Sequence, residues 1–270
     1  MKSLSCVLLA GLSFAATSVG VPHKPNGPFC ATGEPLKGLL DLHRQRNGSV
    51  PENSQRRAQP SPFHVDIDVY MFSILRSTSD ASLTFEQVQT QMQVLNDSFK
   101  KVGFTFLLRD MLRIHHPDWP TNETARDESM YRMLHRGDYT SLNVYFVEKV
   151  DDMGALGSAT FPISGKCDEH GWFRDGVVMQ ASAIANSVGD PPRSGKALVH
   201  EVGHWCGLLH THSTSCSGDD SGDGDFIDDT PVSIVQLATC EEGLDTCPNQ
   251  PGLDPIHNHM SYSNEYVFLP

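Results

Sequence analysis

The 270-residue sequence predicts an α+β fold, in which a mixed, twisted sheet and one histidine-rich helix stand above an irregular, disulfide-bonded lower half. Three observations predict this class. Segments with strand periodicity alternate with segments of helical periodicity as far as residue 209. After that point, Asp, Gly and Pro replace the regular patterns. Six cysteines remain outside the first twenty residues, an even number that suits disulfides in an exported chain.

The elements follow from hydrophobic periodicity. The first strand is predicted over residues 63–75, where Val65, Ile67 and Val69 alternate with polar residues. The first long helix is predicted over 84–103, because apolar residues recur at helical spacing until Gly103. The remaining elements are strands at 104–114, 141–150, 154–162 and 175–184, a short helix at 125–134 and a helix at 194–209. We therefore expect one principal domain, over residues 63–270.

Residues 1–20 have the layout of a secretory signal peptide. Lys2 precedes a short apolar run, and the small residues Ser18 and Gly20 flank the expected cleavage point. The run is too short to cross a bilayer as a helix, and no later stretch reaches that length. We expect a secreted, extracellular product; a buried N-terminal helix is the competing interpretation.

Residues 21–62 are rich in Pro, Gly, Asn, Arg and Gln and show no periodic apolar face. We interpret them as an N-terminal extension or pro-segment. A structured arm that lies on the domain is an equally good interpretation of this composition.

Two further features bear on the route by which the protein is exported and on the partners that it can bind. Acceptor sites for N-glycosylation, which fit a secretory route, begin at Asn47, Asn96 and Asn122. The formal net charge of −13 argues against nucleic acid, because such binding needs clustered Lys and Arg.

The segment HEVGHWCGLLH, residues 200–210, has the residue types and spacing of a metal site. Histidines four apart on a helix differ by only about 40° in direction, so His200 and His204 can converge on one ion. Glu201 can accept a proton from a metal-bound water instead of binding the metal. Five fixed positions within eleven residues are not explained by coincidence. A non-catalytic interpretation therefore requires a degenerate enzyme.

Gly207 supplies the turn that a third ligand needs. With no Cβ it can adopt a positive φ, end the helix and return His210 toward the same ion. A continuous helix would carry His210 too far along its axis. Three neutral imidazoles with an open fourth position are typical of a catalytic zinc.

The pattern HExxHxxGxxH, with a methionine downstream in NHMSYS, resembles the metzincin signature and its Met-turn. The segments LVHEVGHWCGLLHTH, GDFIDDTP, DTCP and DPIHNHMSYS resemble the pappalysin-like secreted metalloproteases, and the fungal extracellular members in particular. The similarity spans residues 63–262. It implies a metzincin-like catalytic domain with endopeptidase activity on proteins and peptides.

The resemblance also implies roles for single residues. It assigns zinc ligation to His200, His204 and His210, and the general base to Glu201. Met260 corresponds to the Met-turn, and Tyr262 to a tyrosine that supports the oxyanion. Without the histidine motif, both would be read as ordinary packing residues.

The acidic run SGDDSGDGDFIDDTP nearly fits a calcium loop, but its twelfth position is Thr230 instead of Glu. The resemblance implies calcium binding near this segment, with Asp225, Asp228 and Thr230 as candidate ligands. A solvated loop is the alternative.

The resemblance pairs Cys216 with Cys247 in a disulfide. It would pair Cys240 with a cysteine after the Met-turn, but Val267 stands there, so the partner of Cys240 stays open.

Cys206 stands inside the histidine motif, and the resemblance brings Cys30 close to the same metal site. Cys30, in PFCATGEP, resembles a pro-segment cysteine whose thiolate caps the zinc; a disulfide from Cys30 to Cys167 is the competing interpretation. Cys206 lies about 200° from His204 around the helix, so it is not expected to bind the metal. It either packs as a small apolar group or enters a disulfide.

Together these features predict a secreted zinc endopeptidase in which Glu201 activates water and Tyr262 supports the oxyanion. We expect protein or peptide substrates, a monomer, and no nucleic-acid or membrane partner. Glu265 is a candidate for the pocket after the cleaved bond, where it would favour a basic side chain. The rival hypotheses are a secreted pseudoprotease that binds proteins without cleaving them, and a calcium-dependent interaction module.

Overall fold

The main sheet has five strands in the order β2-β1-β3-β5-β4. A computed structural model describes residues 30–47, 63–76, 83–117, 119, 128–163, 172–187, 193–217, 224–234 and 241–262. The strands are β1 (Val65–Leu75), β2 (Phe104–His115), β3 (Leu142–Val147), β4 (Gly157–Ala159) and β5 (Val177–Gln180). β1 runs parallel to β2 and β3, β3 runs parallel to β5, and β4 pairs antiparallel with β5 at one edge. The predicted mixed sheet is confirmed.

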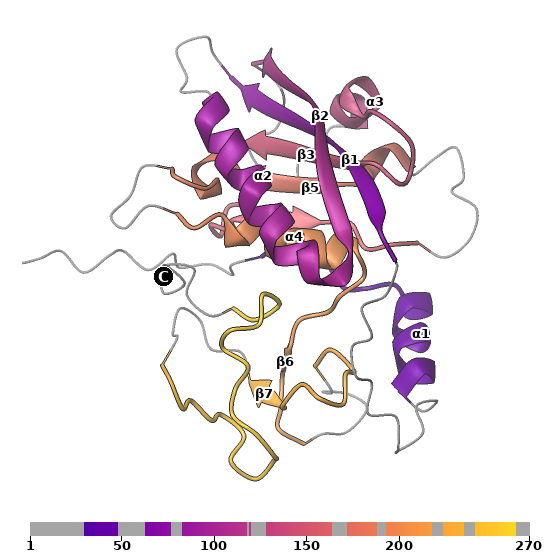
Figure 1. The fold of residues 1–270 in the computed structure, drawn as a ribbon, viewed down its shortest axis with the longest axis vertical. Coiled ribbons are helices and arrows are strands. Elements are labelled where there is room, and N and C mark those ends of the chain that lie inside the picture. The colour runs from indigo at the N-terminus through magenta and orange to yellow at the C-terminus, as the bar shows by residue number, and fades with distance from the viewer. Residues whose placement is uncertain are drawn as a thin grey trace, which may run out of the picture.

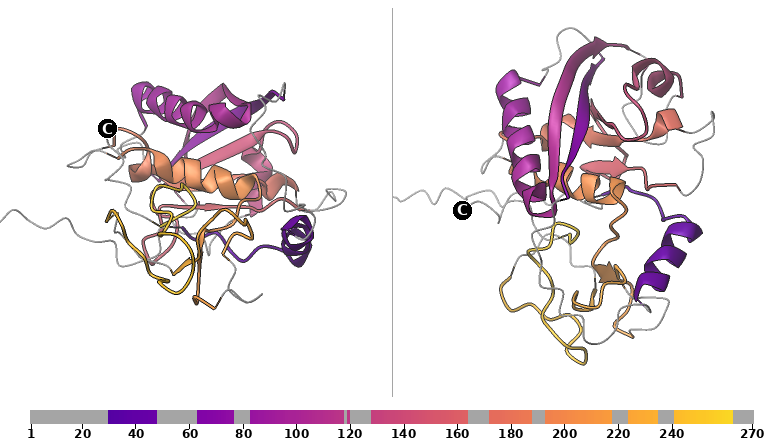
Figure 2. Two further views of the ribbon diagram at one scale, coloured as in Figure 1. Left: turned by 60° about the horizontal axis from the view of Figure 1, so that its bottom comes forward. Right: turned by 45° about the vertical axis from the view of Figure 1, so that its right-hand side comes forward.

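Helices cover both faces of this sheet (Figures 1 and 2). α2 (Phe85–Phe99) and α4 (Lys196–Trp205) pack on one face, and α3 (Glu128–Leu134) packs on the other. Short 3-10 turns complete the upper half: η1 (Lys100–Val102), η3 (Trp172–Arg174) and η4 (Ala181–Ala183). Because both faces are covered, all six residues of β3 are buried, as expected for a central parallel strand.

α2 begins with a capping box and contacts the start of α4 through a buried glutamine. Thr84 accepts a hydrogen bond from the Gln87 backbone, and the Gln87 side chain accepts one from the Thr84 backbone, so the helix begins where the sequence predicts. Further along, the amide of the fully buried Gln91 donates to the Gly195 carbonyl and accepts from the Ala185 backbone. Gly195 precedes the first residue of α4, so Gln91 joins the two helices.

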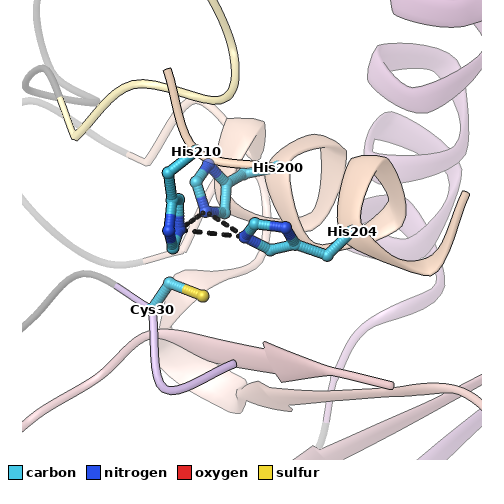
Figure 3. Close-up of side chains that lie close together, drawn as sticks. All are labelled: Cys30, His200, His204 and His210. Atoms are coloured by element: carbon cyan, nitrogen blue, oxygen red, sulfur yellow. Dashed lines mark hydrogen bonds between the residues drawn. The ribbon is translucent and has the colours of Figure 1, made fainter. Parts of the chain in front are cut away.

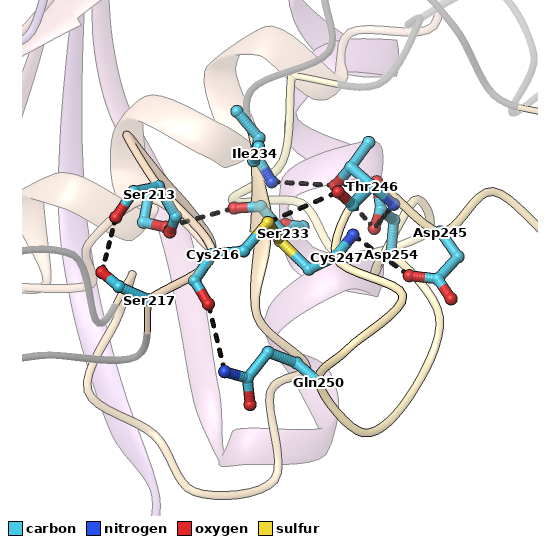
Figure 4. Close-up of a disulfide and its surroundings, with 11 residues drawn as sticks. Ser213, Cys216, Ser217, Ser233, Ile234, Asp245, Thr246, Cys247, Gln250 and Asp254 are labelled. Atoms are coloured by element: carbon cyan, nitrogen blue, oxygen red, sulfur yellow. Dashed lines mark hydrogen bonds between the residues drawn. A yellow bond between two sulfur atoms is a disulfide. The ribbon is translucent and has the colours of Figure 1, made fainter.

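The lower half has little regular structure, as the sequence predicts. Its described strands, β6 (His212–Ser213) and β7 (Ser233–Ile234), have two residues each. A disulfide joins Cys216 to Cys247, the pair that the resemblance implies (Figure 4). Beside it, the Thr246 hydroxyl contacts the Asp254 carboxylate at 2.9 Å and accepts from the Ile234 backbone at 2.9 Å. Side-chain bonds therefore take the place of a sheet ladder here.

The extension contains a helix that its composition does not predict, α1 (Lys37–Asn47). His43 Nε2 lies 3.0 Å from the Gly207 carbonyl, and the Arg44 guanidinium lies 5.2 Å from the Phe226 ring centroid. The helix is therefore stabilised by tertiary contacts with the segment after α4, which a local pattern does not reveal. The described part of the extension is a structured arm on the domain.

Several predictions concern residues outside the described ranges: the signal peptide, Asn122, Cys167, Cys240, Glu265 and Val267. Among the described residues, no helix is long and apolar enough to cross a membrane.

Candidate metal centre

Three histidines meet at one point beside α4 (Figure 3). His200 and His204 project from α4, and His210 returns from the segment that follows it. Their Nε2 atoms lie 3.1 Å (His200 to His204), 3.2 Å (His200 to His210) and 2.9 Å (His204 to His210) apart. The spacing of the sequence motif thus brings together the three nitrogen atoms that the motif predicts.

Gly207 produces the turn that returns His210. Its φ is 95°, in the left-handed region. The Leu208 backbone donates to the Gly203 carbonyl at 2.9 Å, and the Gly207 backbone donates to the His204 carbonyl at 2.8 Å. These two bonds form a Schellman motif, which ends a helix with a glycine in this position.

The three rings are arranged as neutral metal ligands. His200 Nδ1 donates to the His259 carbonyl at 2.7 Å, and His204 Nδ1 donates to the Leu208 carbonyl at 2.8 Å, so Nε2 of each ring offers a lone pair. Burial lowers the pKa of His204 to about 4, and it holds the pKa of His200 and His210 well below the usual value. Neutral rings with lone pairs this close repel one another unless a cation lies between them. The donor set therefore fits a zinc ion.

Cys30 is the fourth member of the cluster. Its Sγ and the three imidazole nitrogens all lie within 4.8 Å of one another, the only such group found among the described residues. Cys30 is buried and not disulfide-bonded, and burial raises the pKa of its thiol well above the usual value. The geometry favours the interpretation of Cys30 as a residue that faces the metal.

Glu201 is fully buried beside the histidines. Its Oε2 accepts hydrogen bonds from the Thr32 hydroxyl at 2.8 Å and from the Cys30 thiol at 3.4 Å. β4 lies directly behind it: a Cβ on Gly157 would stand 2.5 Å from Glu201 Cγ. Sequence reasoning did not single out Thr32 or Gly157, although Thr32 stands in the segment PFCATGEP that contains Cys30.

Met260 and Tyr262 both lie close to the metal-binding histidines. A Cβ on Gly203 would stand 2.4 Å from Met260 Sδ, so the methionine packs against the underside of α4. The Tyr262 ring lies 4.7 Å from the His210 ring, and its hydroxyl donates to the Cys30 carbonyl at 3.4 Å. Burial raises the pKa of Tyr262, so its hydroxyl stays protonated.

Two other residues near the centre were not singled out from the sequence. The ring of His212 stacks on the ring of His210, with centroids 4.8 Å apart. Asp175 is buried and accepts hydrogen bonds from the Trp205 indole at 2.8 Å and from the Thr160 hydroxyl at 3.0 Å. Burial raises the pKa of Asp175 to about 6. The sequence shows only a lone aspartate before a strand, and nothing in it signals that this carboxylate will be buried and bonded to the end of α4.

The acidic loop contributes no second metal cluster among the described residues. The carboxylate of Asp225 accepts from the Thr230 hydroxyl at 3.0 Å and from the Ile227 backbone at 3.1 Å. Asp228 is exposed. Local hydrogen bonds therefore account for the buried carboxylate, and calcium binding by Asp225, Asp228 and Thr230 stays a prediction.

The structure shows the contacts of two further side chains that the sequence singled out, Asn96 and Cys206. The Asn96 amide nitrogen, to which a glycan would attach, donates to the carbonyls of Met92 and Phe106, both at 3.1 Å. A glycan at Asn96 would require both contacts to change. Cys206 is not disulfide-bonded and packs against the core, where burial raises the pKa of its thiol to about 12.

The chain resembles known metalloproteases over most of its length. Residues 126–268 match the family model described as Pregnancy-associated plasma protein-A. An extracellular metalloprotease of Colletotrichum graminicola is 33% identical over 261 residues, which cover 94% of this chain and 88% of the relative. Extracellular metalloprotease 1 of Coccidioides posadasii is 35% identical over 203 residues, which cover 75% of this chain and 70% of the relative.

The fold agrees with that relationship. Mature mirolysin of Tannerella forsythia, solved with a cleaved peptide, superposes with a TM-score of 0.58 over 75% of this chain and 85% of mirolysin, at 22% identity. A mutant of promirolysin from the same organism superposes with a TM-score of 0.59 over 85% of this chain and 79% of that chain, at 21% identity. The fold class is thus the predicted metzincin-like one. By the family model and these relatives, the chain belongs to the pappalysin-like family of metalloproteases.

Proposed function

We propose that this protein is a secreted, zinc-dependent endopeptidase in which Glu201 is the general base. One observation carries the proposal: three neutral imidazoles direct their Nε2 atoms to one point beside a buried carboxylate. A structural zinc site would instead be closed permanently by four protein ligands. Here the fourth group, Cys30, comes from the N-terminal arm and not from the domain that carries the histidines.

His200, His204 and His210 would hold the metal. When bound, zinc acidifies water and polarises the scissile carbonyl. The residues of the chain do the rest of the work. The bonds from Nδ1 of His200 and His204 to backbone carbonyls set the tautomer and the direction of each ring.

Glu201 would move the proton. Its carboxylate adjoins the three imidazoles and lies against β4, with no exposure to bulk solvent. From this position it accepts a proton from the attacking water and then donates it to the leaving amine nitrogen.

Tyr262 would stabilise the oxyanion. Its hydroxyl donates to the Cys30 carbonyl in this structure, so it can donate to a carbonyl oxygen at this position. Burial raises the pKa of the Tyr262 phenol, so near neutral pH it is a hydrogen-bond donor. A donor aimed at developing negative charge is worth about 3–4 kcal/mol in comparable sites.

The N-terminal arm would keep the full chain latent. Cys30 faces the metal-binding nitrogens and contacts Glu201, and its backbone bridges to Gly157 of β4, so the arm covers the histidines and the carboxylate. We propose, following the family resemblance, that Cys30 is the fourth ligand in the latent protein and leaves when residues 21–62 are removed.

Several parts of the proposal rest on the sequence and the relatives' names. Secretion is supported by the signal-like residues 1–20 and by relatives named extracellular metalloproteases. Membership of a protease family supports protein or peptide substrates. The monomeric state, glycosylation at Asn47, Asn96 and Asn122, calcium binding and the role of Glu265 stay predictions.

The decisive experiment compares wild type with Glu201→Gln, which keeps the shape of the side chain and removes the base. Both proteins are analysed for bound metal and then incubated with an unfolded protein substrate, with and without a zinc chelator. We expect one zinc in each, cleavage by processed wild type only, and loss of cleavage on chelation. Internal cleavage sites in the products would identify an endopeptidase.

Three outcomes would contradict the proposal. Absence of zinc from wild type would remove the metal mechanism. Equal cleavage by both proteins would show that Glu201 is not the base. A zinc-loaded wild type that binds substrates without cleaving them would instead support the pseudoprotease.

A further inference from the structure

We propose that the Thr32 hydroxyl is a second latch, which binds the catalytic carboxylate of Glu201 while Cys30 faces the metal ligands. The N-terminal arm would thus silence the base and the metal site by two separate contacts. The inference rests on the function proposed above for Glu201.

The contacts of Thr32 define the latch. Its Oγ1 donates to Glu201 Oε2 at 2.8 Å and accepts from the Ala159 backbone N–H at 2.8 Å. A hydroxyl can donate only one hydrogen bond, and Thr32 donates its bond to the Glu201 carboxylate. The bond is buried on the Glu201 side and charge-assisted, which makes it roughly twice as strong as a neutral one.

The backbone of the arm fixes the register of this contact. Cys30 forms a parallel bridge with Gly157, and the Ala31 backbone donates to the Gly157 carbonyl at 2.8 Å. This pairing brings Thr32 opposite Ala159, the last residue of β4. Since Gly157 has no side chain, Glu201 can lie against β4 and reach the threonine. Thr32 is therefore held against the carboxylate from two directions.

α1 keeps the latch segment near the site. Eleven residues after Thr32, His43 contacts the Gly207 carbonyl at 3.0 Å, and Arg44 stacks over the ring of Phe226. Such a tether raises the local concentration of a short segment at its binding site. If the latch opens, it therefore recloses unless the arm is cut or displaced.

The two latches differ in chemistry. The Thr32 backbone also donates to Cys30 Sγ at 3.2 Å, and this bond does not involve the Thr32 hydroxyl. A Thr32→Val variant removes the hydroxyl contacts while it keeps the side-chain shape and the backbone bond to the thiol. Thr32→Ser keeps the hydroxyl and is the matched control.

The test measures opening of the arm directly, in the zinc-loaded full chain. Wild type, Thr32→Val and Thr32→Ser are treated with iodoacetamide, and alkylation of Cys30 is followed by mass spectrometry on uncut chains. Loss of a buried, charge-assisted bond should raise the alkylation rate of Cys30 in Thr32→Val roughly ten- to hundredfold. Thr32→Ser should stay within about threefold of wild type. Peptidase activity of the same uncut chains should rise in parallel in Thr32→Val.

The proposal is overturned if Thr32→Val is alkylated at the wild-type rate, or if Thr32→Ser opens as readily as Thr32→Val. Circular dichroism checks folding, and Thr32→Ala provides a second deletion if the valine disturbs the strand. If the arm opens as expected but no variant cleaves peptides, the latch stands and the proposed peptidase function fails. The alkylation and activity measurements therefore separate the two failures.

Discussion

At the scale of single residues, the metal centre depends on a glycine, Gly157, which leaves room for the Glu201 side chain. Gly157 lies on the edge strand β4, directly behind the Glu201 carboxylate. Its missing Cβ lets Glu201 occupy the space between the strand and the histidines. A methyl group there would meet Glu201 Cγ at 2.5 Å and Oε1 at 2.8 Å, distances that force the carboxylate to move.

Gly157→Ala is therefore expected to lower kcat of the processed enzyme roughly 100-fold, the usual consequence of displacing a catalytic group by about 1 Å. Zinc content should be unchanged, because the ligands come from other elements. Steady-state kinetics and metal analysis check both expectations. An unchanged kcat in Gly157→Ala would show that this contact does not position the base.

Asp175 is a second residue whose surroundings matter, because they set the pKa of its carboxyl group. Burial raises the pKa of its carboxyl to about 6, although the Trp205 indole and the Thr160 hydroxyl both favour the ionised form. The folded protein therefore holds the Asp175 proton more tightly than the unfolded chain does. The resulting stability is fully present below the unfolded pKa of about 4 and is lost as the pH rises to about 6.

In Asp175→Asn this loss should disappear. The difference in unfolding free energy between variant and wild type should grow by up to about 3 kcal/mol from pH 4 to pH 6, since two pKa units correspond to that amount. Urea titrations at several pH values, with Glu201→Gln in both proteins to prevent self-digestion, measure it. The exposed Asp97→Asn is the control. A difference that is independent of pH would contradict the prediction.

At the scale of elements, the orientation of α4 depends on its junction with α2. Gln91 lies fully buried between them and satisfies the Gly195 carbonyl and the Ala185 N–H. Gly195 has a φ of 78°, and a Cβ there would meet Gln91 Oε1 at 2.8 Å. The start of the metal-binding helix is thus fitted closely around one amide.

Gln91→Met keeps the approximate volume but removes the two side-chain hydrogen bonds to the backbone of Gly195 and Ala185. Losing a buried hydrogen-bond partner costs about 1–3 kcal/mol, so loss of both bonds should lower the unfolding free energy by about 2–6 kcal/mol. Thermal and urea unfolding measure the loss. Gln93→Met, an exposed position on the same helix, should change stability by less than about 0.5 kcal/mol. Equal effects of the two substitutions would mean that Gln91 does not join the helices.

At the scale of the whole molecule, the metal centre lies where the two halves meet. α4 supplies two ligands from the upper half, and the chain below it supplies His210, Met260 and Tyr262. The described lower half has strands of only two residues, so cross-links replace a sheet there. The disulfide between Cys216 and Cys247 closes a sequence separation of 31 residues.

Replacing both cysteines by alanine should lower the unfolding free energy by about 3–4 kcal/mol, between the values for loops of about 15 and 100 residues. Zinc affinity should fall as well, because His210 and the floor of the site belong to the half that loosens. Calorimetry and competition with a chelator measure the two effects. Cys206→Ala, which removes a thiol that forms no disulfide, should leave zinc affinity unchanged. Wild-type affinity in the double variant would show that the lower half is held by other contacts.

Local patterns in the sequence determined most of the elements and the set of metal ligands. Periodicity predicted the strands and α4, because the side of an element that faces the core must be apolar. The spacing of the histidines and the position of Gly207 predicted a convergent site, because helix geometry and positive φ depend only on nearby residues.

Only the tertiary structure decided which distant residues complete the site. Thr32 meets Glu201 across 169 positions, and Trp205 meets Asp175 across 30. Contacts of this kind depend on how strands and helices pack, and neither partner carries a local signal of the other. α1 is the same case at the scale of an element, because its helix is stabilised by the surface beneath it and not by its own sequence.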